Sequence, residues 1–96
     1  MPPKPKLNWR PQAEDDLLTL IGQVADDNPN AAADLLDEIE TKAAKLTDHP
    51  KLYKPSTRVP GHRELVVRAN YIVLYRESAT QVEIVNVLHA RQQWPV

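Results

Sequence analysis

The residues that could carry out chemistry in this chain are histidines and arginines of its second half. His62 and His89 can exchange protons near neutral pH, and Arg63, Arg76 and Arg91 can hold phosphate. Cleavage of RNA by its own 2′-hydroxyl needs a group that takes this proton, a group that protonates the leaving oxygen, and cations that stabilise the phosphorane. If the chain cleaves RNA, the candidate catalytic residues are His89, Arg63 and Arg91.

A basic and aromatic tail ends the chain and suits recognition. Arg91, Gln92 and Trp94 follow a predicted strand that needs nothing further to close its sheet. Trp and Arg are the residue types that most often dominate binding energy, at about 2 kcal/mol or more each when buried against a partner. The alternative is that Trp94 folds back over the open edge of the core.

The same region holds the candidate partner-binding residues. Arg63 stands beside Glu64, with which an exposed ion pair would contribute less than about 1 kcal/mol. Tyr71 and Tyr75 alternate along one strand face, a pattern more typical of packing than of stacking on a partner. If the protein acts by binding, no catalytic residue is expected, and the partner-binding set is Arg63, Tyr71, Tyr75, His89, Arg91, Gln92 and Trp94.

Length and composition limit what else the chain can hold. Its 96 residues predict a single domain over 1–96, and the lack of cysteine excludes disulfides, thiol nucleophiles and cysteine-rich zinc sites. No histidine and acid at helical spacing suggest a metal site, so we expect neither metal nor cofactor. No apolar run is long enough for a signal peptide or a membrane span, and we expect a cytoplasmic protein that does not bind membranes.

Charge is distributed unevenly along the chain. Residues 1–10 carry a net charge of +3, residues 11–48 carry −8, and residues 49–96 carry +4. This asymmetry favours a basic surface on the second half that meets an acidic partner or a nucleic acid. The alternative is two solvated faces that compensate each other within the fold. Lys51, Lys54 and Arg58 form a basic loop, but without interleaved aromatic residues it is a weak signal for nucleic-acid binding.

Hydrophobic periodicity predicts two helices in the acidic segment. Leu17, Leu20, Ile21 and Val24 fall at i, i+3, i+4 and i+7, after Pro11 in the first turn. A second stripe at the same spacing begins after Asn28, which can cap a helix that starts at Pro29 and ends near Asp48. The short connection predicts an antiparallel helical hairpin.

Strand patterns flank this hairpin. Residues 6–10 form a short candidate strand, and residues 63–67, 71–75 and 82–89 predict three antiparallel strands joined by two hairpins. The fold class is therefore α+β: an N-terminal strand, a helical hairpin and a three-stranded antiparallel sheet. Two of these strands are apolar on both faces, and helices can cover only one face. The other face is either shielded by the proline-rich loop and the tail or left as an apolar patch for a partner.

Several segments resemble the RelE/ParE superfamily of small bacterial toxins, and its ParE branch most of all. They are GHRELVV, NYIVLYR and the closing LHARQQWP, with KLNWRPQAEDDL and DNPNAAADLLDEI similar to the first strand and helices of the family. The resemblance implies the fold just described and a cognate antitoxin that wraps and neutralises the protein.

The two branches imply different functions. Resemblance to ParE implies a non-enzymatic poison of DNA gyrase, whereas resemblance to RelE implies an mRNA endonuclease that acts on the ribosome. The nuclease pattern of clustered Lys and Arg with a His or Tyr near the C-terminus is not evident as a motif here, and LHAR is also ordinary in the ParE-like branch. We therefore expect a toxin that acts by binding, with the ribonuclease as the alternative and an interaction module without toxicity as the third possibility.

Overall fold

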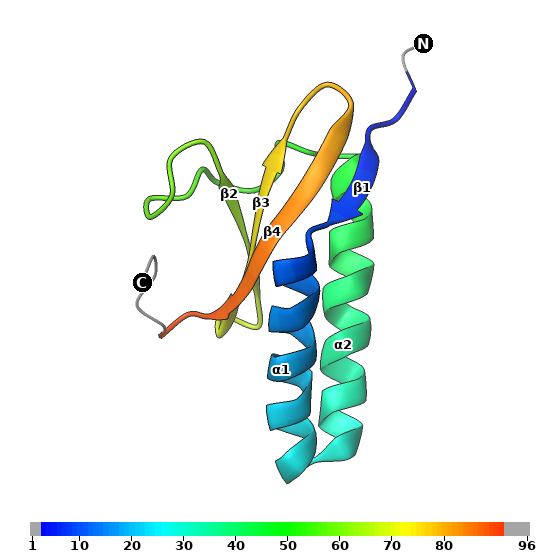
Figure 1. The fold of residues 1–96 in the computed structure, drawn as a ribbon, viewed down its shortest axis with the longest axis vertical. Coiled ribbons are helices and arrows are strands. Elements are labelled where there is room, and N and C mark those ends of the chain that lie inside the picture. The colour runs from blue at the N-terminus through cyan, green and yellow to red at the C-terminus, as the bar shows by residue number, and fades with distance from the viewer. Residues whose placement is uncertain (1–2, 92–96) are drawn as a thin grey trace.

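The computed structural model describes residues 3–91 as a helical hairpin packed on a mixed sheet (Figure 1). In chain order, the elements are β1 (Lys6–Trp9), α1 (Pro11–Asp27), α2 (Pro29–Ala44), the short 3-10 helix η1 (Lys45–Thr47), β2 (Arg63–Val67), β3 (Tyr71–Glu77) and β4 (Gln81–His89). The α+β class and the order of the elements are confirmed. The second helix ends as α2 at Ala44 and continues as η1 almost to the predicted end.

Strand pairing adds one feature that the sequence did not predict. The sheet order is β1-β4-β3-β2, with β1 parallel to β4 and the other pairs antiparallel, so the sheet has four strands instead of three. The N–H of Lys6 donates to the carbonyl of Thr80 and that of Arg10 to Ile84. A parallel pair needs a long crossover connection, which the helical hairpin supplies.

Asn28 makes the turn between the helices. Its backbone N–H donates to the carbonyl of Val24 at the end of α1, and its side chain accepts from the N–H of Ala31 at 3.1 Å to cap α2. Pro29 begins α2, and its lack of an N–H costs no hydrogen bond there because the first N–H groups of a helix have no acceptor within the helix. One residue therefore ends one helix and begins the next.

The core lies between the hairpin and one face of the sheet. The residues that form it are Ala13, Leu17, Leu35, Ile39, Ala43, Leu46, Leu65, Val67, Val73, Tyr75, Val82, Ile84 and Val87. The opposite face is not an open patch along its centre, because Ile72, Leu74 and Leu88 are also buried. The loop that precedes β2 lies on that side of the sheet, away from the helices (Figure 1).

Candidate protein-binding surface

The cations of the second half fall into two groups. Three arginines of the strands and the β2–β3 turn form ion pairs: Arg63 with Glu77, Arg68 with Glu38, and Arg76 with Glu83. Four others have no carboxylate partner among the described residues 3–91: Lys51, Lys54, Arg58 and Arg91. All four are exposed and come from the loop before β2 or from the start of the tail. The positive charge available to a partner is therefore on the loop and tail.

Ser56 shapes the loop that carries Arg58. Its hydroxyl donates to the carboxylate of Glu64 at 2.6 Å and accepts from the N–H groups of Arg58 and Val59 at 3.1 and 3.0 Å. Gly61 has φ +79°, which a residue with a side chain rarely adopts, and returns the chain to β2. The ion pair predicted between Arg63 and Glu64 is wrong, because Glu64 accepts from Ser56 and Arg63 pairs with Glu77.

Arg58 joins the loop to the tail. Its guanidinium donates to the carbonyl of Ala90 at 3.5 Å, and the N–H of Ala90 donates to the carbonyl of Asn70 at 2.6 Å. The N–H of Arg91 donates to Nδ1 of His89 at 3.1 Å, and the His89 ring meets Tyr71 edge-on at 5.5 Å. The loop tip, the β2–β3 turn and the end of β4 thus fix where the chain enters its tail.

Two predicted partner-binding residues serve the interior. Tyr75 is fully buried and donates its hydroxyl to the carbonyl of Pro50 at 2.9 Å, so it packs in the core and is closed to a partner. This burial raises the pKa of the Tyr75 phenol. Arg63 is mostly buried too, because its guanidinium donates to the carbonyl of Tyr53 at 2.8 Å and pairs with Glu77. Both side chains hold the segment 49–55 on the sheet.

The residues proposed for RNA cleavage do not all meet. His89 pairs with Tyr71 in the sheet, whereas Arg63 pairs with Tyr75, four residues further along β3. Four residues of a strand span about 13 Å. His89 and Arg91 are neighbours, but Arg63 belongs to the other end of the sheet. Gln92 and Trp94 lie outside the described residues.

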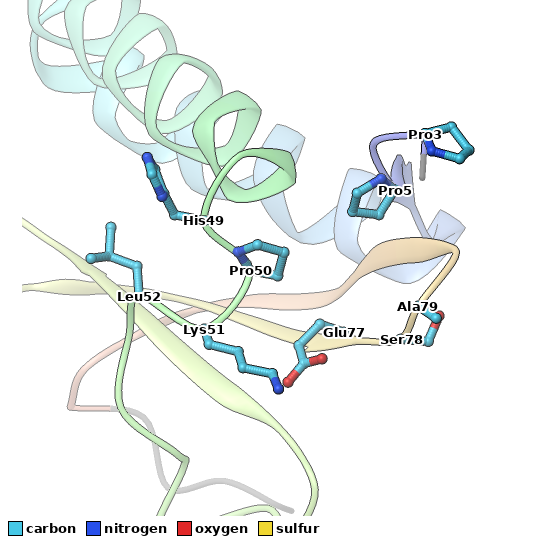
Figure 2. Close-up of a pocket in the computed structure, with 9 residues that line it drawn as sticks. All are labelled: Pro3, Pro5, His49, Pro50, Lys51, Leu52, Glu77, Ser78 and Ala79. Carbon is cyan, nitrogen blue, oxygen red and sulfur yellow. The ribbon is translucent and has the colours of Figure 1, made fainter. Parts of the chain in front are cut away.

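Two hollows lie beside the loop. The larger, about 690 Å³, is lined by Pro3, Pro5, His49, Pro50, Lys51, Leu52, Glu77, Ser78 and Ala79 (Figure 2). The second, about 500 Å³, is lined by Leu52, Tyr53, Lys54, Pro55, Thr57, Glu64 and Val66. Leu52 belongs to both. Sequence reasoning missed Leu52 and Val66; the one available signal was an apolar Leu between Lys51 and Lys54 in a loop without periodicity.

Within residues 3–91 no group of three or more His, Cys, Asp or Glu side chains could hold a metal ion. In the same range, no helix has the length and apolar character needed to cross a membrane.

Comparison with known proteins identifies the family. Residues 7–94 match the family described as the ParE toxin of type II toxin-antitoxin system, parDE. The chain belongs to this family. Y4kP of Sinorhizobium fredii, a candidate toxin, is 36% identical over 91 residues, which cover 94% of this chain and 93% of that protein.

Solved structures agree with this fold. The chromosomal ParDE TA system of P. aeruginosa is similar with a TM-score of 0.78 and 19% identity, over 90% of this chain and 96% of that one. The toxin-antitoxin complex RelBE2 of Mycobacterium tuberculosis is similar with a TM-score of 0.61 and 25% identity, over 93% of this chain and 94% of that one. The expected RelE/ParE superfamily is confirmed.

Proposed function

We propose that this ParE-family toxin acts in the cytoplasm by binding a protein target, that the target is DNA gyrase, and that a cognate antitoxin neutralises it. The toxin class follows from the family, and the solved relatives are described as toxin-antitoxin systems or complexes. The mode of action and the target are proposals.

The observation that carries the proposal is the grouping of exposed, unpaired cations on the loop and the tail. Lys54, Arg58 and Arg91 have no ion pair within the described chain. Arg58 also donates to the carbonyl of Ala90, the residue directly before the tail, so the loop lies beside the start of the tail. Cations that need no reorganisation can bind acidic groups of a partner and speed its association. This arrangement favours binding over catalysis.

The ribonuclease alternative has less support from the geometry. Arg63 is bonded to the carbonyl of Tyr53 and to Glu77. The strand register places it far from His89 along the sheet, so the two side chains do not face one common site for a phosphate. His89 and Arg91 remain adjacent, so the alternative keeps two of its three candidate residues, and its partners would be the ribosome and mRNA.

The test combines purified gyrase with the toxin. We expect the toxin to block supercoiling of relaxed plasmid, and the co-expressed antitoxin to restore it. Induced cells should filament and mount a DNA-damage response while translated mRNA stays intact. Discrete primer-extension stops in ribosome-bound message, abolished by His89→Ala, would place the ribonuclease first and reject binding to gyrase as the mechanism.

A further inference from the structure

The turn between β2 and β3 has an unusual backbone for its sequence. Arg68 and Ala69 both have positive φ angles, 53° and 60°, and the N–H of Asn70 donates to the carbonyl of Val67 at 3.2 Å. Positive φ at both central residues is the pattern of a type I′ turn, which strongly prefers Asn-Gly at these positions. Alanine is disfavoured there, because its Cβ crowds the following carbonyl oxygen. Such a strained turn persists only where surrounding contacts hold it.

Two contacts of this turn lie outside its own hairpin. Nε of Arg68 donates to Oε1 of Glu38 on α2 at 2.8 Å, so the turn is attached to the helical hairpin. The carbonyl of Asn70 accepts from the N–H of Ala90 at 2.6 Å. Ala90 directly precedes Arg91 and the tail. The strained turn therefore connects a helix on one side to the residue from which the tail begins.

Ala90 continues the pairing of β3 with β4 through one backbone bond. The register makes Asn70 and Ala90 the pair that follows the last residues of the two strands. A hydrogen-bonded antiparallel pair exchanges two bonds, but the N–H of Asn70 donates to Val67 within the turn. The carbonyl of Ala90 accepts instead from the guanidinium of Arg58 at 3.5 Å. The turn and Arg58 between them thus engage both backbone groups of Ala90.

We infer that the β2–β3 turn positions the tail for its target, because it holds the last residue before the tail in one place. The inference rests on the proposed function, in which cations of the loop and tail bind the target. A turn with negative φ at both central residues would splay the two strands and move the Asn70 carbonyl away from Ala90. A tail that leaves the sheet in a fixed direction loses less conformational freedom on binding, so its affinity is higher. Arg68, Ala69 and Asn70 are thus positioning residues that need not touch the target.

The experiment varies Ala69 in the full-length toxin. Ala69 is exposed, so a larger side chain there meets no core residue. Asn and Val are similar in size, but Asn adopts positive φ readily whereas a β-branched residue rarely does. We expect Ala69→Val to raise the toxin concentration that half-inhibits gyrase supercoiling by at least about tenfold. Ala69→Asn and Ala69→Gly keep the turn and should inhibit as wild type.

Amide hydrogen exchange reports the contact between the turn and Ala90 directly. The N–H of Ala90 is bonded to Asn70 and should exchange slowly in wild type, Ala69→Asn and Ala69→Gly, and faster in Ala69→Val. Asn28→Ala is the control for lost stability, because it removes the cap of α2 in the connection between the helices. It should lower the thermal midpoint and leave both gyrase inhibition and Ala90 exchange near wild type.

A second variant loosens the turn without changing its residues. Glu38→Ala removes the carboxylate that holds Arg68, and loss of this partly exposed ion pair should leave the fold intact. We expect a smaller change of the same sign, with the half-inhibitory concentration raised about two- to fivefold and faster exchange of Ala90. Glu40→Ala is the matched control, because Glu40 is exposed and forms no ion pair among residues 3–91. If Ala69→Val does not fold, Glu38→Ala decides.

The outcomes separate this inference from the proposed function. If wild-type toxin does not inhibit gyrase, the proposed target fails, and growth arrest on induction scores the same variants instead. If Ala69→Val and Glu38→Ala are as active as wild type, or if their Ala90 amides stay protected, the turn does not position the tail and only this inference is overturned. If Ala69→Asn is as weak as Ala69→Val, the side chain at position 69 meets the target directly, which equally overturns the inference.

Discussion

The carboxylate of Asp16 on α1 accepts a hydrogen bond from the backbone N–H of Val87 on β4 at 3.0 Å. It also accepts from the side chain of Asn86 at 3.0 Å. β1 pairs with β4 only as far as Ile84, and Asp16 satisfies the edge of β4 just beyond that point. The side chain of Asp16 thus bonds the edge of β4 beyond the end of β1, and it attaches α1 to the sheet.

Loss of this contact should destabilise the fold. Asp16→Ala leaves a part-buried N–H and an amide without their acceptor, which costs about 1–3 kcal/mol. For a domain of this size each kcal/mol lowers the thermal midpoint by roughly 4–8 °C. Thermal unfolding by circular dichroism measures the effect. Asp15→Ala is the control, since Asp15 is exposed, and equal midpoints for the two variants would show that the Asp16 contact contributes nothing.

The hydroxyl of Tyr75 should make stability depend on alkaline pH. Burial raises the pKa of Tyr75 above its ordinary value of 10.0, so the folded state favours the neutral phenol. The resulting stabilisation is complete below that ordinary pKa and is lost as pH rises through the higher pKa of the folded state. Urea unfolding from pH 8 to 12 should therefore show a decline that Tyr75→Phe reduces. At neutral pH the same variant should lose about 0.5–1.5 kcal/mol with its bond to Pro50.

A Tyr75→Phe curve that runs parallel to wild type through the alkaline range would refute the link between this phenol and stability.

Two glycines offer a clean contrast between helix propensity and backbone strain. A Cβ added at either Gly22 or Gly61 meets no atom within 4 Å, so space does not distinguish them. Gly22 lies inside α1, where alanine is favoured by about 0.8–1.0 kcal/mol. Gly61 has φ +79°, where alanine costs roughly 1–2 kcal/mol. We expect Gly22→Ala to raise the thermal midpoint and Gly61→Ala to lower it. Shifts of the same sign would contradict the expected contrast between helix propensity at Gly22 and backbone strain at Gly61.

The tail should carry toxicity with little effect on stability. Arg91→Ala, or truncation after Ala90, is expected to abolish growth arrest on induction while the thermal midpoint and antitoxin affinity stay near wild type, because the strands and core lie before it. Lys45→Ala removes an exposed cation elsewhere and should remain toxic. If Trp94 instead covers the core, truncation should lower the midpoint by several degrees. A truncated chain that stays folded and fully toxic would exclude the tail from the mechanism.

Arg58→Ala tests whether the loop and tail act as one surface. It removes a cation and the contact with the Ala90 carbonyl, and we expect toxicity to fall as it does for Arg91→Ala. Arg76→Ala is the control, because Arg76 is engaged with Glu83 on the sheet. Full toxicity of the Arg58 variant would mean that the tail, or another surface, suffices without the loop.

The sequence by itself determined the elements and much of their order. The 3.6-residue period of Leu17, Leu20, Ile21 and Val24 and the cap at Asn28 define the helices through interactions within a few residues. Strands 63–67, 71–75 and 82–89 were predicted within two residues of β2, β3 and β4, since β-branched runs and turns are also local signals.

Only the tertiary structure decided which strands pair and which side chains remain available. These features depend on contacts between residues far apart in the chain. They are the parallel pairing of β1 with β4, the hydrogen bond of Asp16 to Val87, and the ion pairs of Arg63, Arg68 and Arg76. Periodicity reports which face a residue occupies but not what lies opposite it. For that reason Arg63 and Tyr75 resembled surface candidates in the sequence, whereas the exposure of Leu52 and the contact of Arg58 with Ala90 emerged only from the folded structure.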